Sequence, residues 1–137
     1  MQDKERCILS QVRYEHALEC LQSAKALVEL GQFKSAANRI YYAAFHAMRA
    51  VLSLDGIDMK HHSGVISEFR RLYIKEGIFE TKISGIISDL FNIRTDSDYD
   101  DFYIISKSAV TQHLNNAEYF VEVVSNYLKS QWQQQEI

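Results

Sequence analysis

Apolar residues recur along much of the chain at spacings of three and four positions, which is the pattern of a helix with one apolar face. The first segment with this pattern has a stripe formed by Ala17, Leu18, Leu21, Ala24, Leu27 and Val28. No segment has the regular alternation of apolar and polar residues that is typical of a half-buried strand. The pattern therefore predicts a chain built from helices.

Glycines mark the expected ends of these helices. Gly31, Gly56 and Gly77 each follow a stretch with helical spacing, where a C-terminal cap is expected, and the chain contains no proline. Short connections place neighbouring helices antiparallel. The expected fold class is all-α, an up-and-down antiparallel helical bundle of about five helices. We place them over residues 3–30, 33–54, 62–76, 80–93 and 103–131.

Length and composition favour a single folded domain over residues 1–137. The chain is 47% hydrophobic and 24% charged, which are ordinary values for a globular protein and argue against disorder. A chain of 137 residues can bury a sizeable core, and it contains no internal repeat or low-complexity tract. The tail from Gln131 to Ile137 is polar and is expected to fray.

Charge and cysteine usage exclude some classes of function. The net charge of −3 argues against binding nucleic acid through bulk positive charge, although a local basic patch stays possible. Cys7 and Cys20 lie in one predicted helix, about 20 Å apart, which is beyond disulfide reach. Two reduced thiols are expected, and their spacing does not match a zinc site. The polar N-terminus lacks a signal-peptide core and no apolar run could span a membrane, so we expect a soluble, cytoplasmic protein.

The second predicted helix is rich in side chains that could bind a ligand. Tyr42, His46 and Arg49 follow one another at spacings of four and three, Asn38 precedes them by four and Phe45 lies three positions after Tyr42, so these five positions share one broad face. Arg39 lies beside them. One interpretation is that the aromatic residues fill the core while Arg39 and Arg49 are solvated and His46 is a packing residue. The other is that Arg39, Tyr42 and His46 bind a nucleotide or RNA.

Lys60, His61 and His62 precede the third predicted helix. Adjacent imidazoles without a carboxylate at ligand spacing are a weak metal signal, so we predict no metal site. The segment suits helix initiation, with Ser63 or His62 near the N-cap. It also suits contact with a phosphate, because free N–H groups at a helix start attract anions. A basic flank follows on the third helix, at Arg70, Arg71 and Lys75, where RNA or an acidic partner could dock.

The segment from Arg94 to Asp101 combines one arginine with four aspartates and Tyr99, and we expect it to form a turn after the fourth helix. A planar cation at the edge of a rigid element suits phosphate recognition. Alternatively, the aspartates cap the last helix and Arg94 pairs with one of them. Alternating Asp96, Asp98 and Asp100 suggest a calcium loop, but the glycine and the final glutamate of an EF-hand are missing.

Three segments together resemble a known family. They are residues 36–47 (AANRIYYAAFHA), residues 60–66 (KHHSGVI) and residues 90–100, from Leu90-Phe-Asn-Ile-Arg94 to Asp98-Tyr-Asp100. In this order they resemble the HEPN domain family (higher eukaryotes and prokaryotes nucleotide-binding), within it a small stand-alone bacterial and archaeal branch. The resemblance implies an all-α bundle, usually a homodimer, without a cofactor. It also implies a nucleotide- or RNA-binding surface, for which we name Arg39, Tyr42, His46, Lys60, His61, His62 and Asp98.

Many members of this family are toxins paired with a small nucleotidyltransferase antitoxin, and several are metal-independent endoribonucleases. In those nucleases an arginine holds the scissile phosphate, and a histidine separated from it by four to six residues moves a proton. Arg94 matches the arginine, but positions 99–101 hold Tyr99, Asp100 and Asp101. A tyrosine with the reference pKa of about 10 is a poor base at neutral pH. Catalysis would therefore need Tyr99 as a proton donor, or His61 or His62 brought close by folding or dimerisation.

Two hypotheses follow from the sequence. The first is a toxin-like protein that acts on RNA or a nucleotide, with Arg94 and Tyr99 as the catalytic candidates and a nucleotidyltransferase as its partner. The second is a non-catalytic dimerisation module that binds a nucleotide or a protein through the same residues. Neither hypothesis requires a metal, a cofactor or a membrane.

Overall fold

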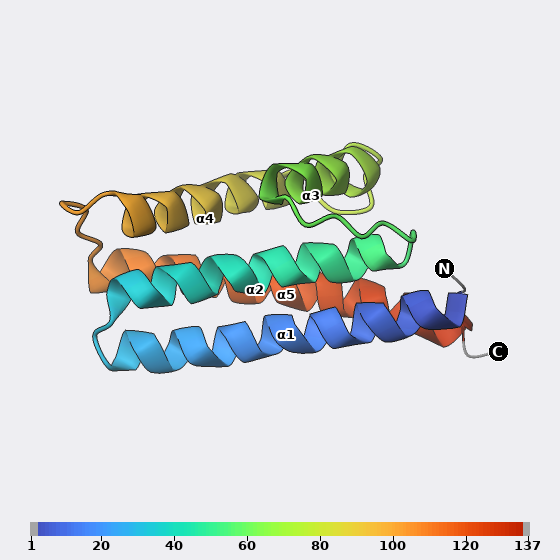
Figure 1. Ribbon diagram of the computed structural model, residues 1–137, viewed down its shortest axis with the longest axis horizontal. Helices are drawn as coiled ribbons and strands as arrows, with labels where there is room; N and C mark the ends of the chain where they lie inside the picture. The colour runs from blue at the N-terminus through green and yellow to red at the C-terminus, as the bar shows by residue number, and fades with distance from the viewer. Residues whose placement is uncertain (1–2, 136–137) are drawn as a thin grey trace.

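The computed structural model describes residues 3–135, and within that range the regular structure consists of helices and contains no strand (Figure 1). The expected all-α helical bundle is therefore confirmed. Three long helices run side by side, and two shorter helical segments lie along one side of them (Figure 1). The elements are α1 (Asp3–Glu29), α2 (Phe33–Ser53), α3 (His62–Phe69), the π-helical turn η1 (Arg70–Ile74), α4 (Lys82–Tyr99) and α5 (Lys107–Gln135).

Helix α2 occupies the centre of the bundle and contacts α1, α3, α4 and α5. Six alanines between residues 36 and 50 are at most 1% exposed, and such small side chains let the neighbouring helices approach closely. Between Ala36 and Ser53, every residue is buried except for one stripe of five. This stripe, which we call the α2 stripe, consists of Asn38, Arg39, Tyr42, His46 and Arg49.

The turn between α1 and α2 forms as the sequence predicts. Gly31 has φ of +77°, a conformation that costs a residue with a Cβ atom but not glycine. Its N–H donates to the carbonyl of Val28 and the N–H of Gln32 donates to the carbonyl of Leu27, which is the Schellman arrangement that ends a helix. This turn makes α1 and α2 antiparallel.

The prediction of a turn from Arg94 to Asp101 is wrong, because α4 continues through Arg94. The helix ends at Tyr99 and not at residue 93. Ile93 and Ser97 are both buried, so the apolar face of the helix continues past the expected end. An Arg94–Asp98 ion pair, between residues four positions apart, stabilises the added turn. The aspartates that resemble turn residues in the sequence are thus partly helical.

The last helix is also displaced from its expected bounds. It begins at Lys107 instead of residue 103, because the Ser106 hydroxyl accepts the N–H of Ala109 at 3.1 Å and caps the helix there. It continues to Gln135, beyond the expected end at residue 131. Trp132 fixes this end to α1 by donating its Nε1–H to the hydroxyl of Ser10 at 3.1 Å. The part of the tail at residues 136–137 lies outside the described range.

Cys7 and Cys20 are buried free thiols, as the sequence indicates. The third predicted helix exists, but it ends as a π-helical turn at Ile74 and not at residue 76.

Among the helices of the described range, none combines the length and the apolar character needed to cross a bilayer.

Arg13 connects α1 to the end of α2 and to the loop that follows. Its side chain is 9% exposed, and it donates to the hydroxyl of Ser53 at 2.8 Å and to the carboxylate of Asp58 at 2.6 Å. Arg49 of the α2 stripe donates to the same Asp58 oxygen at 3.0 Å. Two arginines and one carboxylate therefore hold the start of the loop that leads to α3.

We predict that Arg13→Met destabilises the fold by about 1–3 kcal/mol, because it removes two hydrogen bonds from a buried cation while keeping most of the side-chain volume. The free energy of unfolding in urea measures the effect. Arg71→Met is the matched control, since Arg71 pairs with Glu68 on the surface and such pairs contribute about 0–1 kcal/mol. Equal losses for the two variants would contradict a structural role for Arg13.

Candidate functional site

Arg94 lies where the last turns of α4 meet α2, among three tyrosine rings. Its guanidinium carbon is 5.6 Å from the ring centre of Tyr41, 5.7 Å from that of Tyr42 and 5.8 Å from that of Tyr99. Its Nη2 is 3.4 Å from the hydroxyl of Tyr42. The side chain is 18% exposed, so it is held in place and yet reaches solvent. Aromatic faces attract a guanidinium by about 0.5–2 kcal/mol each, depending on desolvation.

A chain of polar contacts joins Arg94 to the α2 stripe. Nε of Arg94 is 2.9 Å from Oδ2 of Asp98, an ion pair without hydrogen-bond alignment. The same Asp98 oxygen accepts from the side-chain amide of Asn38 at 3.3 Å, and Asn38 in turn accepts two N–H groups of Arg39, at 2.7 and 3.1 Å. Arg39 also lies over the ring of Tyr42, at 5.0 Å. Two arginines therefore flank Tyr42, and a single carboxylate is bonded to the group.

A solvent-open hollow of about 510 Å³ borders this network on the side of α1 and α2. Asn38, Arg39 and Asp98 line it, together with Lys34 at the start of α2. Its charged groups are thus two cations and one carboxylate, so the hollow favours an anion in spite of the negative net charge of the chain.

His62 enters the same region from the first turn of α3. Its ring stacks on Phe45 at 4.3 Å between centres, and its Nδ1 is 2.8 Å from the hydroxyl of Tyr41. Burial lowers the pKa of His62, and the nearby Arg94 and Arg49 lower it further. Burial raises the pKa of Tyr41, so its hydroxyl keeps its proton. We assign that hydroxyl as the donor to Nδ1, which leaves the proton of neutral His62 on Nε2.

His46 belongs to the α2 stripe, and its ring is half-buried. Its ring packs against Tyr42 at 6.0 Å and against His16 of α1 at 5.5 Å. Burial, with smaller effects from His16 and nearby arginines, lowers the pKa of His46 to about 4. The imidazole is therefore neutral at pH 7, and its buried Nδ1 has no hydrogen-bond partner among the described residues. This arrangement favours a packing role for His46.

The structure brings most of the named site residues together. Arg39, Tyr42, Arg94 and Asp98 form the contacts described above, and His62 reaches them through Tyr41. Tyr99 touches Arg94 with its ring, although its side chain is 73% exposed.

Lys60 and His61 are placed differently. Both are exposed on the loop before α3, and neither has a side-chain contact with the Arg94 cluster among those found in residues 3–135. His61 occupies the N-cap position of α3 without a capping hydrogen bond from its side chain.

Sequence reasoning did not single out Tyr41 for this site. Its position on the apolar face of α2 indicates a core residue, and it is indeed only 1% exposed. Its hydroxyl nevertheless bonds His62 and its ring contacts Arg94. Asn38 precedes Tyr42 by four positions, so the sequence already places both on one face of the helix. This spacing is the signal for including Asn38 in the site, where it bonds Asp98. Among residues 3–135, no group of histidine, cysteine and acidic side chains could hold a metal ion.

Comparison with known proteins agrees with the arrangement of these motifs. The model of the HEPN domain matches residues 10–127. A UPF0332 protein of Thermotoga maritima is 30% identical over 94% of this chain and 96% of its own length. A protein of Methanocaldococcus jannaschii named as a candidate toxin is 34% identical over 87% of this chain and 88% of its own. A UPF0332 protein of Archaeoglobus fulgidus is 32% identical, covering 85% and 92%.

The resemblance expected from the three sequence segments is therefore confirmed over most of the chain, including α2, the start of α3 and the end of α4. The chain belongs to the HEPN domain family.

Proposed function

We propose that this toxin-like HEPN protein binds RNA or a nucleotide through a phosphate held by Arg94, and that it is the partner of a small nucleotidyltransferase. In this proposal, residues 1–137 form a single HEPN domain. The observation that carries it is the placement of Arg94. Its guanidinium is fixed by three tyrosine rings, and its ion-pair partner Asp98 lines a hollow that also contains Lys34 and Arg39.

The surroundings of Arg94 suit exchange of one anion for another. Its carboxylate partner Asp98 is itself 28% exposed, and such partly solvated ion pairs contribute little net free energy. A phosphate offers stronger, bidentate hydrogen bonds to a guanidinium than a single carboxylate oxygen with poor alignment. Arg94 needs little reorganisation to make them, because the tyrosine rings already fix its position.

The geometry supports binding more strongly than cleavage. Attack by a 2′-hydroxyl requires a base near the phosphate, and neutral His62 presents a protonated Nε2 on the assignment above, which makes it a donor. The half-buried ring of His46 packs against Tyr42, and its pKa is lowered to about 4, which makes it a weak base. Tyr99 remains available as a proton donor from its exposed position beside Arg94. Without a base, these groups would stabilise a bound phosphate more readily than they would start a reaction on it.

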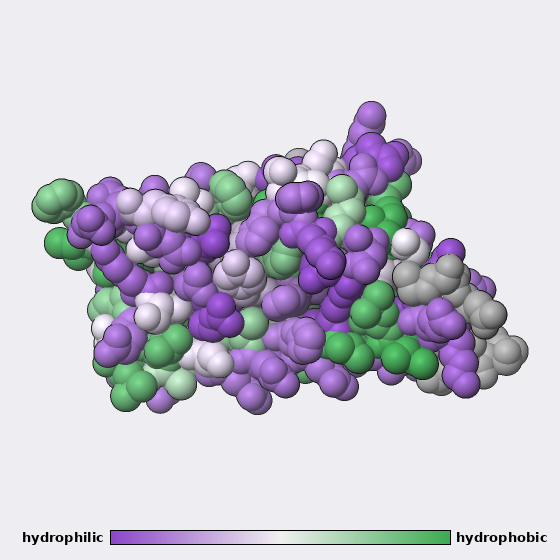
Figure 2. Space-filling view, viewed as in Figure 1, coloured by the Kyte–Doolittle hydropathy of each residue, from purple (hydrophilic) through white to green (hydrophobic). Residues whose placement is uncertain are grey.

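A second candidate function, a protein-binding dimerisation module, is favoured by apolar side chains at the same end of the molecule. Phe102 is 92% exposed and Ile104 is 89% exposed, both on the loop between α4 and α5. Figure 2 shows apolar groups at the end of the molecule where Figure 1 places this loop. Exposed apolar groups of this kind often mark a protein interface. We therefore include a homodimer and a nucleotidyltransferase partner in the proposal.

We predict that Arg94→Ala weakens binding of a single-stranded oligoribonucleotide by about 10- to 100-fold, the effect of losing about 1.5–3 kcal/mol of hydrogen bonding to a charged group. Fluorescence polarisation measures the affinity, and a gel of the same samples reports any cleavage. Arg94→Lys should lose part of the affinity, since lysine keeps the charge but not the planar fork. Lys25→Ala removes an exposed cation of α1 that lies outside the cluster, and it should have little effect. Equal binding by wild type and Arg94→Ala would refute the role of Arg94.

We predict that stability falls as the pH drops from about 6.5 to about 4, in part because of His46. Its pKa is lower in the folded state than in the unfolded state, so the unfolded chain binds more protons in this window and acid favours unfolding. After allowance for solvent around the half-buried ring, the loss is roughly 1–2 kcal/mol. Urea unfolding of wild type and His46→Gln across this range measures it. An unchanged pH slope in His46→Gln would contradict the assignment.

We predict that replacing the exposed apolar pair with Phe102→Ser and Ile104→Ser lowers the affinity of self-association or of binding to a nucleotidyltransferase partner. Analytical ultracentrifugation at micromolar concentration reports the first, and co-purification with a nucleotidyltransferase encoded beside this gene reports the second. Ile78→Ser removes another exposed apolar side chain, 47% exposed, from the connection between η1 and α4 and serves as the control. A monomeric wild-type mass would refute the homodimer.

A further inference from the structure

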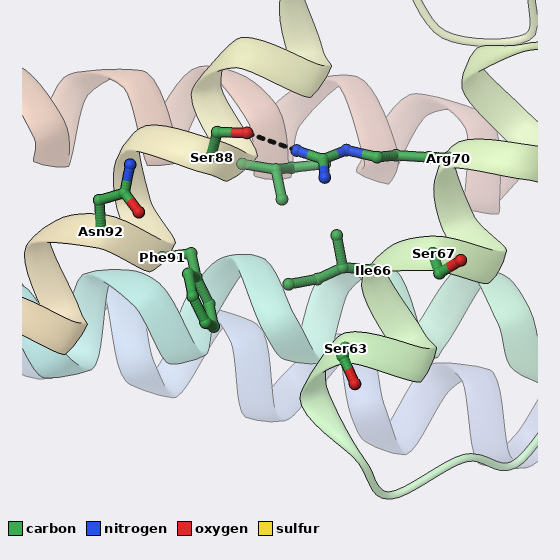
Figure 3. Close-up of a pocket in the computed structure, with 8 residues that line it drawn as sticks. Ser63, Ile66, Ser67, Arg70, Ser88, Phe91 and Asn92 are labelled. Carbon is green, nitrogen blue, oxygen red and sulfur yellow. Dashed lines mark hydrogen bonds between the residues drawn. The ribbon is translucent and has the colours of Figure 1, made fainter.

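A second hollow, of about 450 Å³, lies between α3 and α4 and is separate from the one beside Arg39 (Figure 3). Its volume is within the range of small-molecule sites, about 300–1,000 Å³. Ile66 of α3 and Phe91 of α4 face each other across the gap in Figure 3, and Ile87 adds to the apolar lining. These residues give the hollow apolar walls, one of which is an aromatic ring that is partly open to solvent.

The remaining lining is polar and carries no negative charge. Neutral side chains from both helices complete it: Ser63, Ser67, Ser88 and Asn92. Arg70 is the charged group, and its guanidinium reaches from η1 to α4 (Figure 3). There it donates to the hydroxyl of Ser88 at 2.6 Å and to the carbonyl of Ser84 at 3.0 Å. Both of these bonds use Nη2, and the buried Nε has no partner among the described residues.

This hollow is connected to the Arg94 cluster through contacts between neighbouring side chains. The ring of Phe91 contacts the ring of Tyr41 at 5.9 Å between centres, and Tyr41 contacts Arg94 and His62. Phe91 precedes Arg94 by three positions, so both lie on neighbouring turns of one face of α4. On the opposite wall, Ser63 directly follows His62. Phe91 and Arg94 are both partly exposed, so a ligand held at Arg94 could extend along this face of α4 to the hollow.

We propose that the α3–α4 hollow holds one unpaired nucleobase of the RNA strand whose phosphate is bound at Arg94. An aromatic wall and an opposing aliphatic wall suit the two faces of a planar base. Hydroxyl and amide groups can both donate and accept, so they can bond the edge of more than one base. The positive charge of Arg70 suits the adjoining backbone. Only an unstacked, unpaired base can enter such a site, so a base-paired duplex is excluded as the ligand. This inference rests on the proposed function of Arg94.

The test fills the hollow with aliphatic side chains that cannot themselves stack on a base. Ser67 and Asn92 line it from opposite helices and are both exposed, so the double variant Ser67→Leu, Asn92→Leu should fold. Ser23→Leu places the same side chain on an exposed position of α1 and is the matched control. Each protein is titrated with a fluorescein-labelled single-stranded oligoribonucleotide, with a series in which one nucleotide at a time is abasic, and with the corresponding duplex.

In the wild type, removal of one particular base should weaken binding by about 5- to 100-fold, the usual effect of losing one base–aromatic contact. The double variant should bind the intact strand more weakly than the wild type does, by a similar factor. It should also bind the intact strand and the abasic strand equally. Ser23→Leu should behave as wild type, and the duplex should bind more weakly than the single strand.

If Arg94→Ala weakens binding but the double variant binds and discriminates as wild type does, the base site is refuted and the proposed function stands. If the wild type binds none of the strands, the RNA-binding form of the proposed function is refuted. A direct measurement then decides the base site separately: a titration with uridine and adenosine monophosphates, followed by NMR, should shift the signals of Phe91 and Ile66 in the wild type. Shifts confined to other residues would overturn the base site.

Discussion

The burial of α2 by four other helical elements is the constraint on which the rest of the structure depends. Its alanines admit α1, α3, α4 and α5 at close range, so from Ala36 to Ser53 the side chains that are not fully buried are confined to the stripe from Asn38 to Arg49. Each residue of that stripe must then find a polar or aromatic partner on a neighbouring element. Arg49 finds Asp58, Asn38 finds Asp98, and Tyr42 lies between Arg39 and Arg94. The candidate site is thus the part of the central helix that the bundle leaves uncovered.

The same constraint explains how much could be predicted from the sequence. Spacings of three and four placed Asn38, Tyr42, Phe45, His46 and Arg49 on one face. The structure leaves these residues partly exposed except for Phe45, which is buried. The end of α4 could not be predicted in this way, because aspartates that favour turns by local chemistry are equally suited to an ion pair one helical turn from Arg94. The hydrogen bond between Tyr41 and His62 joins residues 21 positions apart and has no local signal.

The added turns of α4 change the character of the Arg94 segment. In a flexible turn, arginine and aspartate would compete with water and their geometry would vary. On a helix packed against α2, Arg94 and Asp98 have a fixed separation, and Arg94 is further restricted by the rings of Tyr41 and Tyr42. Arginine near the C-terminus of a helix is also favoured by the helix dipole, whereas the aspartates there are disfavoured. The fixed cation is therefore the stable feature of this segment, and Asp98 is the partner that a stronger anion can replace.

Electrostatics also limits how the protein could hold RNA. The net charge is −3, and the cations at the candidate site are Lys34, Arg39 and Arg94, beside a loop that carries Asp100 and Asp101. Binding through so few phosphate contacts releases few counterions, so charge alone would give weak affinity with a shallow dependence on salt. Useful affinity must then come from contacts with the bases. Phe91, at the wall of the α3–α4 hollow, is the aromatic residue placed to supply them, and Tyr41 couples its position to that of Arg94.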